Sequence, residues 1–368
     1  MGVWDIKERN DLVRANEIRG SRGFFMGGTT PGAVSDIYQI DITSTGNAVD
    51  FGGNLQGEQN GAGKGTNAGS AVRIIYGGGS TAPAAPANGA STQISYFTPI
   101  HSGNAADFGN LTLRRTSLVS LSNNTRALFG GGYDYAGAPA SSGTNKNIID
   151  FITIQSLGNA VDFGDLTRST SSTSGTGNTI RGFVGGGDPQ VNTVDAVLFK
   201  SKGNSSDFGN LTNTVTRLGA SGNKTRGIFG GGESPEDASG YTNTIGYLNL
   251  SSAGNASDFG DLSSRRSDVT AAASPTRLVF GGGLEAPGKQ NELEYITIAS
   301  TGNTTDFGDL TAVNAAPAGT SSATKALYGG GDTGSVIKTI DFITIATTSN
   351  ASNFGDLTAV RKRLGGGS

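Results

Sequence analysis

The chain has 368 residues, of which 60 are glycine, with 35% hydrophobic residues, 15% charged residues and a formal net charge of −3. This composition excludes a coiled coil, a helix bundle and collagen, and the acidic balance argues against a nucleic-acid-binding surface. Zero cysteines and one histidine exclude disulfides, thiolate metal sites, cysteine nucleophiles and most zinc sites.

Residues 4–18 contain many helix formers and predict a short amphipathic helix, with Asp5 and Glu8 spaced as a capping pair. Its apolar residues fall on two roughly opposite stripes, so we expect both sides to be covered. We interpret residues 1–20 as a segment that attaches to a larger assembly, and a frayed leader with one packed stripe is the alternative. The candidate attachment residues are Trp4, Ile6, Leu12, Val13 and Ile18. The start of the chain has no secretory apolar region, and no apolar run approaches the roughly 18 residues of a membrane span.

Two markers alternate along the rest of the chain, seven times each. One is a basic residue, three mostly apolar residues and a glycine run, and the other is an Asp-Phe-Gly triplet, usually preceded by Gly-Asn and two small residues. In the seventh copy Asn353 replaces the aspartate. The basic residues are Arg22, Arg73, Arg126, Arg181, Arg226, Arg277 and Lys325, and the phenylalanines are Phe51, Phe108, Phe163, Phe208, Phe259, Phe307 and Phe354. The phenylalanines are 57, 55, 45, 51, 48 and 47 residues apart, a period typical of propeller blades or a solenoid.

Each repeat is predicted to hold four short strands: the apolar run into the glycines, an alternating stretch such as 149–154, the stretch around the triplet, and a Ser/Thr-rich stretch. Four strands in about 50 residues favour a propeller blade over a solenoid coil. Glycine runs allow backbones to approach closely and permit positive φ. The phenylalanine and a leucine three residues later are expected to pack between blades, each contributing ~1.5–3 kcal/mol.

The last residues predict how the ring closes. Residues 358–368 resemble the Ser/Thr-rich strand of another repeat, whereas the first repeat lacks that strand. We therefore expect the C-terminal strand to complete the N-terminal blade, which removes unpaired sheet edges. The predicted fold is an all-β, seven-bladed propeller over residues 21–368, preceded by the helical segment 1–20.

These blades resemble kelch repeats, in which a hydrophobic strand ends in a glycine pair and a later aromatic is followed after three residues by an apolar one. That later aromatic is generally Trp in kelch repeats and is Phe here. The sequence motif Gly-Asn-Ala-x-Asp-Phe-Gly-Asp-Leu-Thr is similar to repeats in virion structural proteins of tailed bacteriophages, especially those of marine and cyanobacterial hosts. The resemblance covers about residues 20–368.

The resemblance implies a non-enzymatic virion structural protein, displayed on tail or capsid, assembled in the host cytoplasm, and needing no cofactor or metal. Its implied partners are other virion proteins, through the N-terminal segment, copies of itself within an assembly, and a glycan or protein of the host surface. Two alternatives stay open: a carbohydrate-acting propeller enzyme, and a cellular kelch-type protein-interaction module.

Several motifs imitate catalytic ones. Asp-Phe-Gly matches the kinase metal-binding triplet, but it repeats at blade spacing without the other kinase motifs. We expect its aspartates to bond turn backbone, or alternatively to pair with the basic residue of the blade, as Asp162 with Arg181. The copper radical oxidases among kelch-like propellers use a Tyr–Cys cross-link, which a chain without cysteine lacks. The regularly spaced arginines are expected to be scaffold, and His101 is expected at the surface.

Binding is expected on the variable loops that follow the glycine runs, since all of them should emerge on one face and loops on rigid scaffolds carry function. The candidate binding residues are Tyr133, Asp134, Tyr135 and Tyr241. Glycoside hydrolysis would need a pair of carboxylates. The non-repeated acids include Asp134, Glu233, Glu236, Asp237, Glu285 and Glu292, and the sequence shows no pair among them.

Overall fold

The structure is a computed structural model that describes residues 22–30, 32–53, 55, 67–70, 72–79, 89–99, 102–134, 143–285 and 288–367. The predicted helix with Trp4, Ile6, Leu12, Val13 and Ile18 lies outside the described residues, as do Tyr135 and His101. The predictions for these residues therefore stay predictions.

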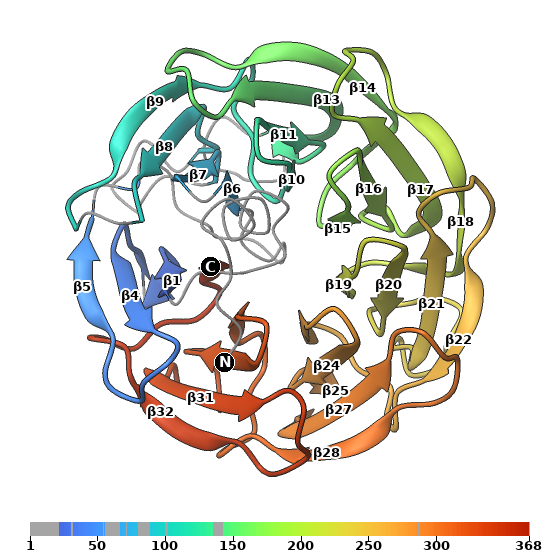
Figure 1. The fold of residues 1–368 in the computed structure, drawn as a ribbon. Helices are drawn as coiled ribbons and strands as arrows, with labels where there is room; N and C mark the ends of the chain where they lie inside the picture. Colours follow the sequence, from blue (N-terminus) through green and yellow to red (C-terminus); the bar gives the residue numbers. More distant parts are fainter. Residues whose placement is uncertain are drawn as a thin grey trace, which may run out of the picture.

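Seven antiparallel sheets surround a central axis like the blades of a propeller, each with four strands and the third with β12 as a fifth (Figure 1). Blade 1 consists of β33 (Gly365–Gly367), β1 (Arg22–Met26), β4 (Ile37–Asp41) and β5 (Val49–Gly52). Blade 2 consists of β6 (Asn67–Ser70), β7 (Arg73–Gly77), β8 (Gln93–Phe97) and β9 (Ala106–Asn110). Blade 3 consists of β10 (Val119–Ser122), β11 (Arg126–Gly130), β13 (Thr144–Thr153) and β14 (Val161–Thr170). Blade 4 consists of β15 (Ser174–Gly177), β16 (Arg181–Gly185), β17 (Val191–Leu198) and β18 (Ser206–Val215).

The remaining three blades repeat the same order, from the axis outward. Blade 5 consists of β19 (Gly219–Gly222), β20 (Arg226–Gly230), β21 (Thr244–Asn249) and β22 (Ser257–Asp261). Blade 6 consists of β23 (Thr270–Ala273), β24 (Arg277–Gly281), β27 (Glu292–Thr297) and β28 (Thr305–Asp309). Blade 7 consists of β29 (Ala318–Ser321), β30 (Lys325–Gly329), β31 (Thr339–Thr344) and β32 (Ser352–Asp356). Short additional strands are β2 (Thr29–Thr30), β3 (Gly32–Ala33), β12 (Tyr133–Asp134), β25 (Leu284–Glu285) and β26 (Gly288–Lys289).

The predicted ring closure is confirmed. The C-terminal strand β33 pairs antiparallel with β1, so that Phe24 faces Gly367 and Met26 faces Gly365 across the ladder. The N-terminal blade is therefore built from both ends of the described chain, and β1 gains a neighbour on its inner edge.

The core lies between blades rather than within one sheet. Seven apolar clusters each join two neighbouring blades, and every cluster contains one phenylalanine of an Asp-Phe-Gly or Asn-Phe-Gly triplet. These seven phenylalanines are at most 4% exposed. The predicted layer of aromatic side chains between blades is therefore confirmed, and it explains how a chain with few hydrophobic residues holds its core.

The glycine runs have a steric role at each blade interface. A Cβ on Gly77 would lie 2.7 Å from the Phe129 ring of the next blade, so the first glycine makes room for that ring. The second and third glycines of the next run, Gly131 and Gly132, adopt φ of 62° and 101°, a region that glycine enters at little cost.

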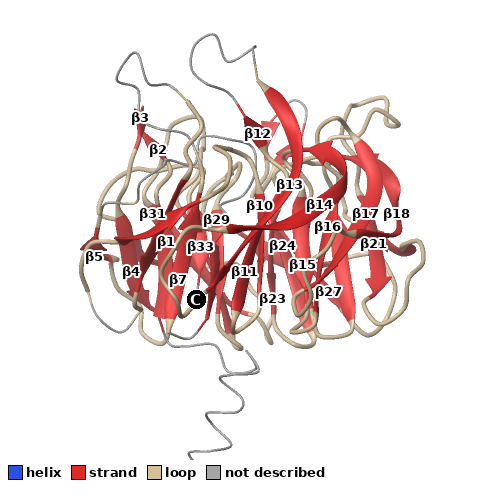
Figure 2. Ribbon diagram, turned by 90° about the horizontal axis from the view of Figure 1, so that it is seen from above, coloured by secondary structure: helices blue, strands red, loops and turns tan. Residues whose placement is uncertain are grey.

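The blade ends form two different faces, shown edge-on in Figure 2. On one, the hairpin face, short turns join the first strand to the second and the third to the fourth. On the other, the loop face, the glycine runs lead into loops that are longer than these turns in every blade but the fourth, and the linkers pass from blade to blade.

The regular basic residues tie the hairpin face together. Arg73 donates to the Ile154 carbonyl of the next blade at 2.7 Å, and its guanidinium lies 4.8 Å from the Tyr96 ring centroid. Six of the seven basic residues donate to a next-blade carbonyl in this way: Arg22, Arg73, Arg126, Arg226, Arg277 and Lys325. For these six the predicted scaffold role is confirmed.

Candidate functional site: the loop face

The loop face varies most between blades, and the outer strands that lead to it are longest in blades 3 and 4. Strands β13, β14 and β18 have ten residues each and β17 has eight, whereas the outer strands of the other blades have four to six. Register shifts within β13–β14 and β17–β18 bend these extensions. Figure 2 shows β12 and the first part of β13 standing high on this face, as does the β2–β3 hairpin of blade 1.

The candidate residues on β12 are partly used by the scaffold. The Asp134 carboxylate accepts from Arg114 Nε at 3.0 Å and lies 3.7 Å from Lys146 Nζ. Tyr133 pairs with Asn145 across the ladder and is half-buried. The structure thus places Tyr133 and Asp134 on the loop face, as predicted, but gives Asp134 two cationic partners that the sequence does not reveal.

The loop of blade 5 is held in the same manner. Tyr241 is half-buried and bridges to Glu233 through backbone. Glu233 pairs with Arg217 at 2.8 Å, and Asp237 pairs with Arg265 at 3.1 Å. Tyr133 and Tyr241 belong to different blades, 3 and 5, so the described candidates are spread over the face and do not share one pocket.

Beneath the loops, charged groups are buried between the blades. Asp150 on β13 and Arg115 from the preceding linker are both fully buried, with Arg115 Nη2 2.5 Å from Asp150 Oδ2. Arg115 also donates to the carbonyls of Gly131 and Ile148, and Thr112 donates to Asp150. Burial lowers the pKa of Arg115, against the attraction of Asp150. This contact ties the linker to the glycine run of the next blade.

Other blade interfaces carry different polar contacts in the same region. Arg168 pairs with Asp195 at 2.6 Å, and Arg361 pairs with Asp36 at 2.6 Å. Asp341 accepts hydrogen bonds from Thr311, and burial raises its pKa. We call these contacts the loop-face seam of the blade interfaces.

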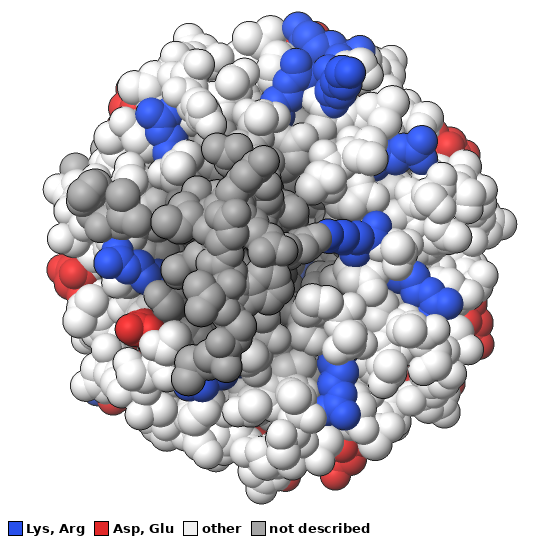
Figure 3. Space-filling model, viewed as in Figure 1, with Lys and Arg blue, Asp and Glu red and all other residues white. Residues whose placement is uncertain are grey.

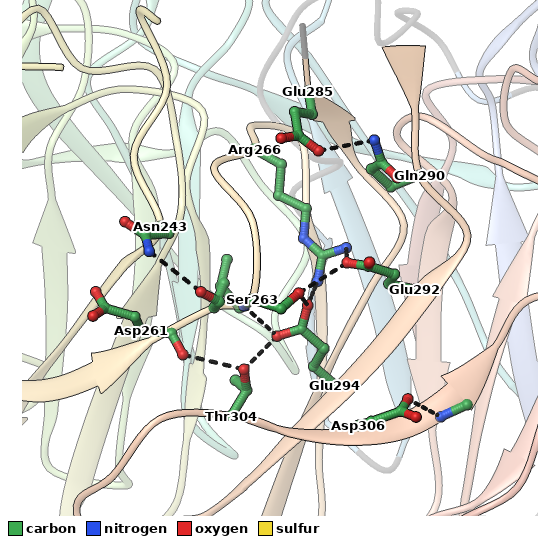
Figure 4. Close-up of polar contacts among 12 residues, drawn as sticks. Asn243, Asp261, Ser263, Arg266, Glu285, Gln290, Glu292, Glu294, Thr304 and Asp306 are labelled. Atoms are coloured by element: carbon green, nitrogen blue, oxygen red, sulfur yellow. Dashed lines mark hydrogen bonds and ion pairs between the residues drawn. The ribbon is translucent and has the colours of Figure 1, made fainter. Parts of the chain in front are cut away.

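The richest such contact lies between blades 5 and 6 (Figure 4). Arg266, fully buried, contacts Glu294 at 2.5 Å and Glu292 at 3.2 Å. Ser263 Oγ lies within hydrogen-bond distance of both carboxylates, and Thr304 donates to Glu294. Burial raises the pKa of Glu292. Burial also acts against ionisation of Glu294, but Arg266, Ser263 and Thr304 together hold its pKa below the ordinary value.

The pair Glu292 and Glu294 is a carboxylate pair that the sequence did not reveal, because Glu294 occupies a regular strand position. Retaining and inverting glycosidases set two carboxyl groups about 5–10 Å apart with the sugar between them. Here both carboxylates contact the same guanidinium, that of Arg266, and the Ser263 hydroxyl lies within hydrogen-bond distance of both (Figure 4). The arrangement is suited to joining blades 5 and 6.

The Gly-Asn-x-x-Asp-Phe-Gly motif joins blades at the opposite end of each interface. Asp162 Oδ1 accepts from the Gly164 amide at 3.0 Å, so the prediction that these aspartates bond turn backbone is confirmed. Asn204 of the next blade accepts from the Asp165 amide at 3.1 Å, and the Gly203 amide donates to the Phe163 carbonyl at 2.7 Å. The asparagine contact occurs at all seven interfaces, through Asn47, Asn104, Asn159, Asn204, Asn255, Asn303 and Asn350. We call this the hairpin-face seam.

Neither seam was predicted as a contact between specific partners. The repeat itself held a signal for the hairpin-face seam, since an invariant asparagine at fixed spacing from the triplet indicates a repeated contact. The loop-face seam had no such signal in the repeat, because its charged partners lie 26 to 35 residues apart, or 325 apart for Arg361 and Asp36, and their side chains differ between blades.

Over the part of the chain that the structure describes, no three His, Cys, Asp or Glu side chains are grouped as metal ligands would be. Within the same residues, no helix has the length and apolar character of a membrane span.

Comparisons with known proteins show the fold class alone. No protein-family model matches the chain, and no curated protein matches it in sequence. Among solved structures, one titled "Structure of YjhT" is similar with a TM-score of 0.57 and 13% identity, covering 79% of this chain and 98% of that chain. The chain is thus a seven-bladed β-propeller, and its sequence similarity to that structure is too low to transfer an activity.

Proposed function

We propose that this protein is a non-catalytic structural component of a phage virion, a rigid propeller displayed on tail or capsid whose loop face meets the host surface. The observation that carries the proposal is how the repeated polar residues are used. Asparagines, aspartates and basic residues of the repeat bond to neighbouring backbone, which fits a scaffold built for rigidity.

The display role is supported by the contrast between the faces. The hairpin-face seam is the same at seven interfaces, while the loops after the glycine runs differ in length and composition between blades. Binding residues concentrate on loops held by rigid scaffolds. Copies multiplied by the symmetry of a particle would add weak loop contacts into useful avidity.

Two measurements on particles and on the purified propeller test this proposal. Peptides of the chain should be found by mass spectrometry in purified particles, and gold-labelled antibodies should decorate the tail or capsid of intact particles. The propeller should bind host cells without degrading their surface polysaccharide. Absence of the chain from particles contradicts the virion role, and release of sugars contradicts the non-catalytic role.

The alternative is a carbohydrate-acting enzyme, and the favouring observation is Glu292, whose side chain is 41% exposed and whose pKa is raised by burial. An acid of this kind can act as a proton donor. The alternative predicts hydrolysis of host polysaccharide that Glu292→Gln abolishes, with Glu285→Gln as a control on the same loop face.

A further inference from the structure

An apolar and basic surface lies on the hairpin face at blades 3 and 4, away from the loop face. Its apolar members are highly exposed: Leu157 by 56%, Val161 by 49%, Ile180 by 63% and Leu198 by 45%. Exposed large apolar side chains that gather in one place mark interaction sites.

Leu198 departs from the repeat at a structural cost. It faces Arg181 across the ladder, and the residues directly opposite the basic residue in five other blades are polar: Asp41, Thr153, Asn249, Thr297 and Thr344. In blade 5, Asn249 accepts from the Ser251 amide at 3.0 Å and from its hydroxyl at 2.7 Å, which closes the turn. A leucine forms neither bond, so stability of the turn does not explain its presence.

Ile180 departs in the same way. In blades 3 and 5 the residue before the basic one is a threonine, and the Thr125 and Thr225 hydroxyls each donate to the asparagine of the hairpin at 3.0 Å. Ile180 keeps only the backbone bond, from its amide to Asn178 at 2.9 Å. Its apolar side chain is therefore exposed at a position where blades 3 and 5 have a threonine that hydrogen-bonds to the turn.

The two departures are adjacent and continue into blade 3. The Phe199 amide donates to the Ile180 carbonyl at 3.0 Å, and Arg126 of blade 3 donates to the Phe199 carbonyl at 2.6 Å. Lys202 Nζ lies 5.3 Å from the Phe151 ring centroid, and Phe151 faces Val161 across its ladder. Ile180 and Leu198 are thus neighbours, and Arg126 and Lys202 connect this part of blade 4 to Phe151 and Val161 of blade 3.

Positive charge surrounds this surface. Figure 3 looks onto the hairpin face, where Lys and Arg side chains gather over the sector of β13 and β14. Lys200 and Lys202 stand in the turn between β17 and β18, where blade 5 has Ser251 and Ala253. Arg181 lies beside Ala196, which replaces the aromatic residue that stacks on the equivalent arginine in blades 3 and 5. Two exposed carboxylates, Asp162 and Asp207, follow the hairpin turns of blades 3 and 4.

We propose that this blade 3–4 patch, formed by Val161, Ile180, Leu198, Lys200 and Lys202, docks the propeller onto another structural protein of the particle. The partner presents apolar side chains flanked by carboxylates, since both features are needed to match the patch. This inference rests on the proposed function, and it adds the attachment surface and the chemistry of the partner.

The test replaces the departures with residues of the repeat. Ile180→Thr together with Leu198→Asn restores the turn bonds, so the propeller keeps or gains thermal stability. Particles assembled in cells that supply this variant should carry at least about tenfold fewer copies than particles with the wild-type chain. Val72→Thr is the matched control, because Val72 is 52% exposed at the equivalent position of blade 2, and it should leave the copy number unchanged.

A second pair of variants separates the class of partner. Lys200→Ser with Lys202→Ala should lower the copy number several-fold, and wild-type attachment should weaken with salt. Equal copy numbers for wild type and the Ile180/Leu198 variant overturn the patch. A different result would overturn the protein partner. In it, the wild type binds phosphatidylglycerol vesicles or heparin, the lysine variant loses this binding, and the Ile180/Leu198 variant keeps it. Absence of the wild-type chain from particles overturns the proposed function, and this partner with it.

Discussion

The two ends of each blade interface solve the same packing problem differently. At the hairpin-face seam, the same asparagine contact joins blade to blade seven times. At the loop-face seam, the position beside the third glycine holds Arg115 or Arg266 in some linkers and Val215 in another, and the facing strand residue is Asp150, Glu294 or Gly246.

The contrast between the two seams indicates which contacts specify the ring. One chain contains interfaces with a buried ion pair and an interface with a buried valine, and all of them hold the same backbone arrangement. A buried ion pair must offset the desolvation of both charges, so replacing both partners by apolar groups is often neutral. The repeated contacts to backbone in the hairpin-face seam therefore specify how the blades are arranged, and the side chains of the loop-face seam can differ between interfaces.

The largest effect is expected at the triplet glycine. A Cβ on Gly164, where φ is 144°, would lie 2.4 Å from the Gly203 backbone of the next blade, so Gly164→Ala should lower the free energy of unfolding by about 4 kcal/mol or more. Gly158→Ala is the control: φ is 148°, open space surrounds the site, and backbone strain alone costs about 1–3 kcal/mol. Urea unfolding measures both, and equal losses would show that the close approach is unimportant.

The loop-face seam should respond next. Arg115→Met leaves Asp150 buried without its cation, which costs about 3 kcal/mol or more. The double variant Arg115→Val with Asp150→Gly copies the blade 4–5 interface and should be more stable than the single variant by at least about 1 kcal/mol. Thermal and urea unfolding of the two variants decide the matter. A double variant less stable than the single one would refute the view that the seam tolerates either chemistry.

A smaller loss is expected for one asparagine contact. Asn159 accepts from the Asn110 amide at 3.0 Å and is exposed, so Asn159→Ala should cost about 0.5–1.5 kcal/mol. Asn159→Asp keeps an acceptor oxygen and serves as the control in the same unfolding assay. An alanine variant as stable as the wild type would show that the backbone contacts suffice without this side chain.

The smallest effect is a difference in pH dependence between two acids of the loop-face seam. Burial raises the pKa of Asp341, so its contribution is greatest below the ordinary carboxyl pKa and is lost as pH rises through the raised value. The pKa of Glu294 is lowered, so its contribution is present above the ordinary value and is lost as pH falls.

Unfolding free energies between pH 3 and 7 test these signs. Asp341→Asn should gain stability relative to the wild type as pH rises, and Glu294→Gln should lose stability relative to the wild type over the same interval. Parallel curves for the two variants would contradict the assignment of opposite shifts.

The repeats made the blade number, the strand order and the closing strand predictable, since each follows from counting copies and noting what the first and last copies lack. The interblade phenylalanines were predictable for the same reason. For the candidate loop residues, the sequence predicted only the face of the propeller on which they lie. Asp134 is held by Arg114 and Lys146, and Glu292 meets Glu294 through Arg266, because linkers from a preceding blade meet strands of the next.

The amino-acid order is enough to predict a ring of seven similar sheets, because its apolar residues are buried when sheets with a fixed period of strands, glycines and aromatics pack side by side. The tertiary structure alone decided which charges neutralise one another and which departures from the repeat form one surface. Arg266 meets Glu294, and Ile180 lies near Leu198, only once strands have paired and blades have packed.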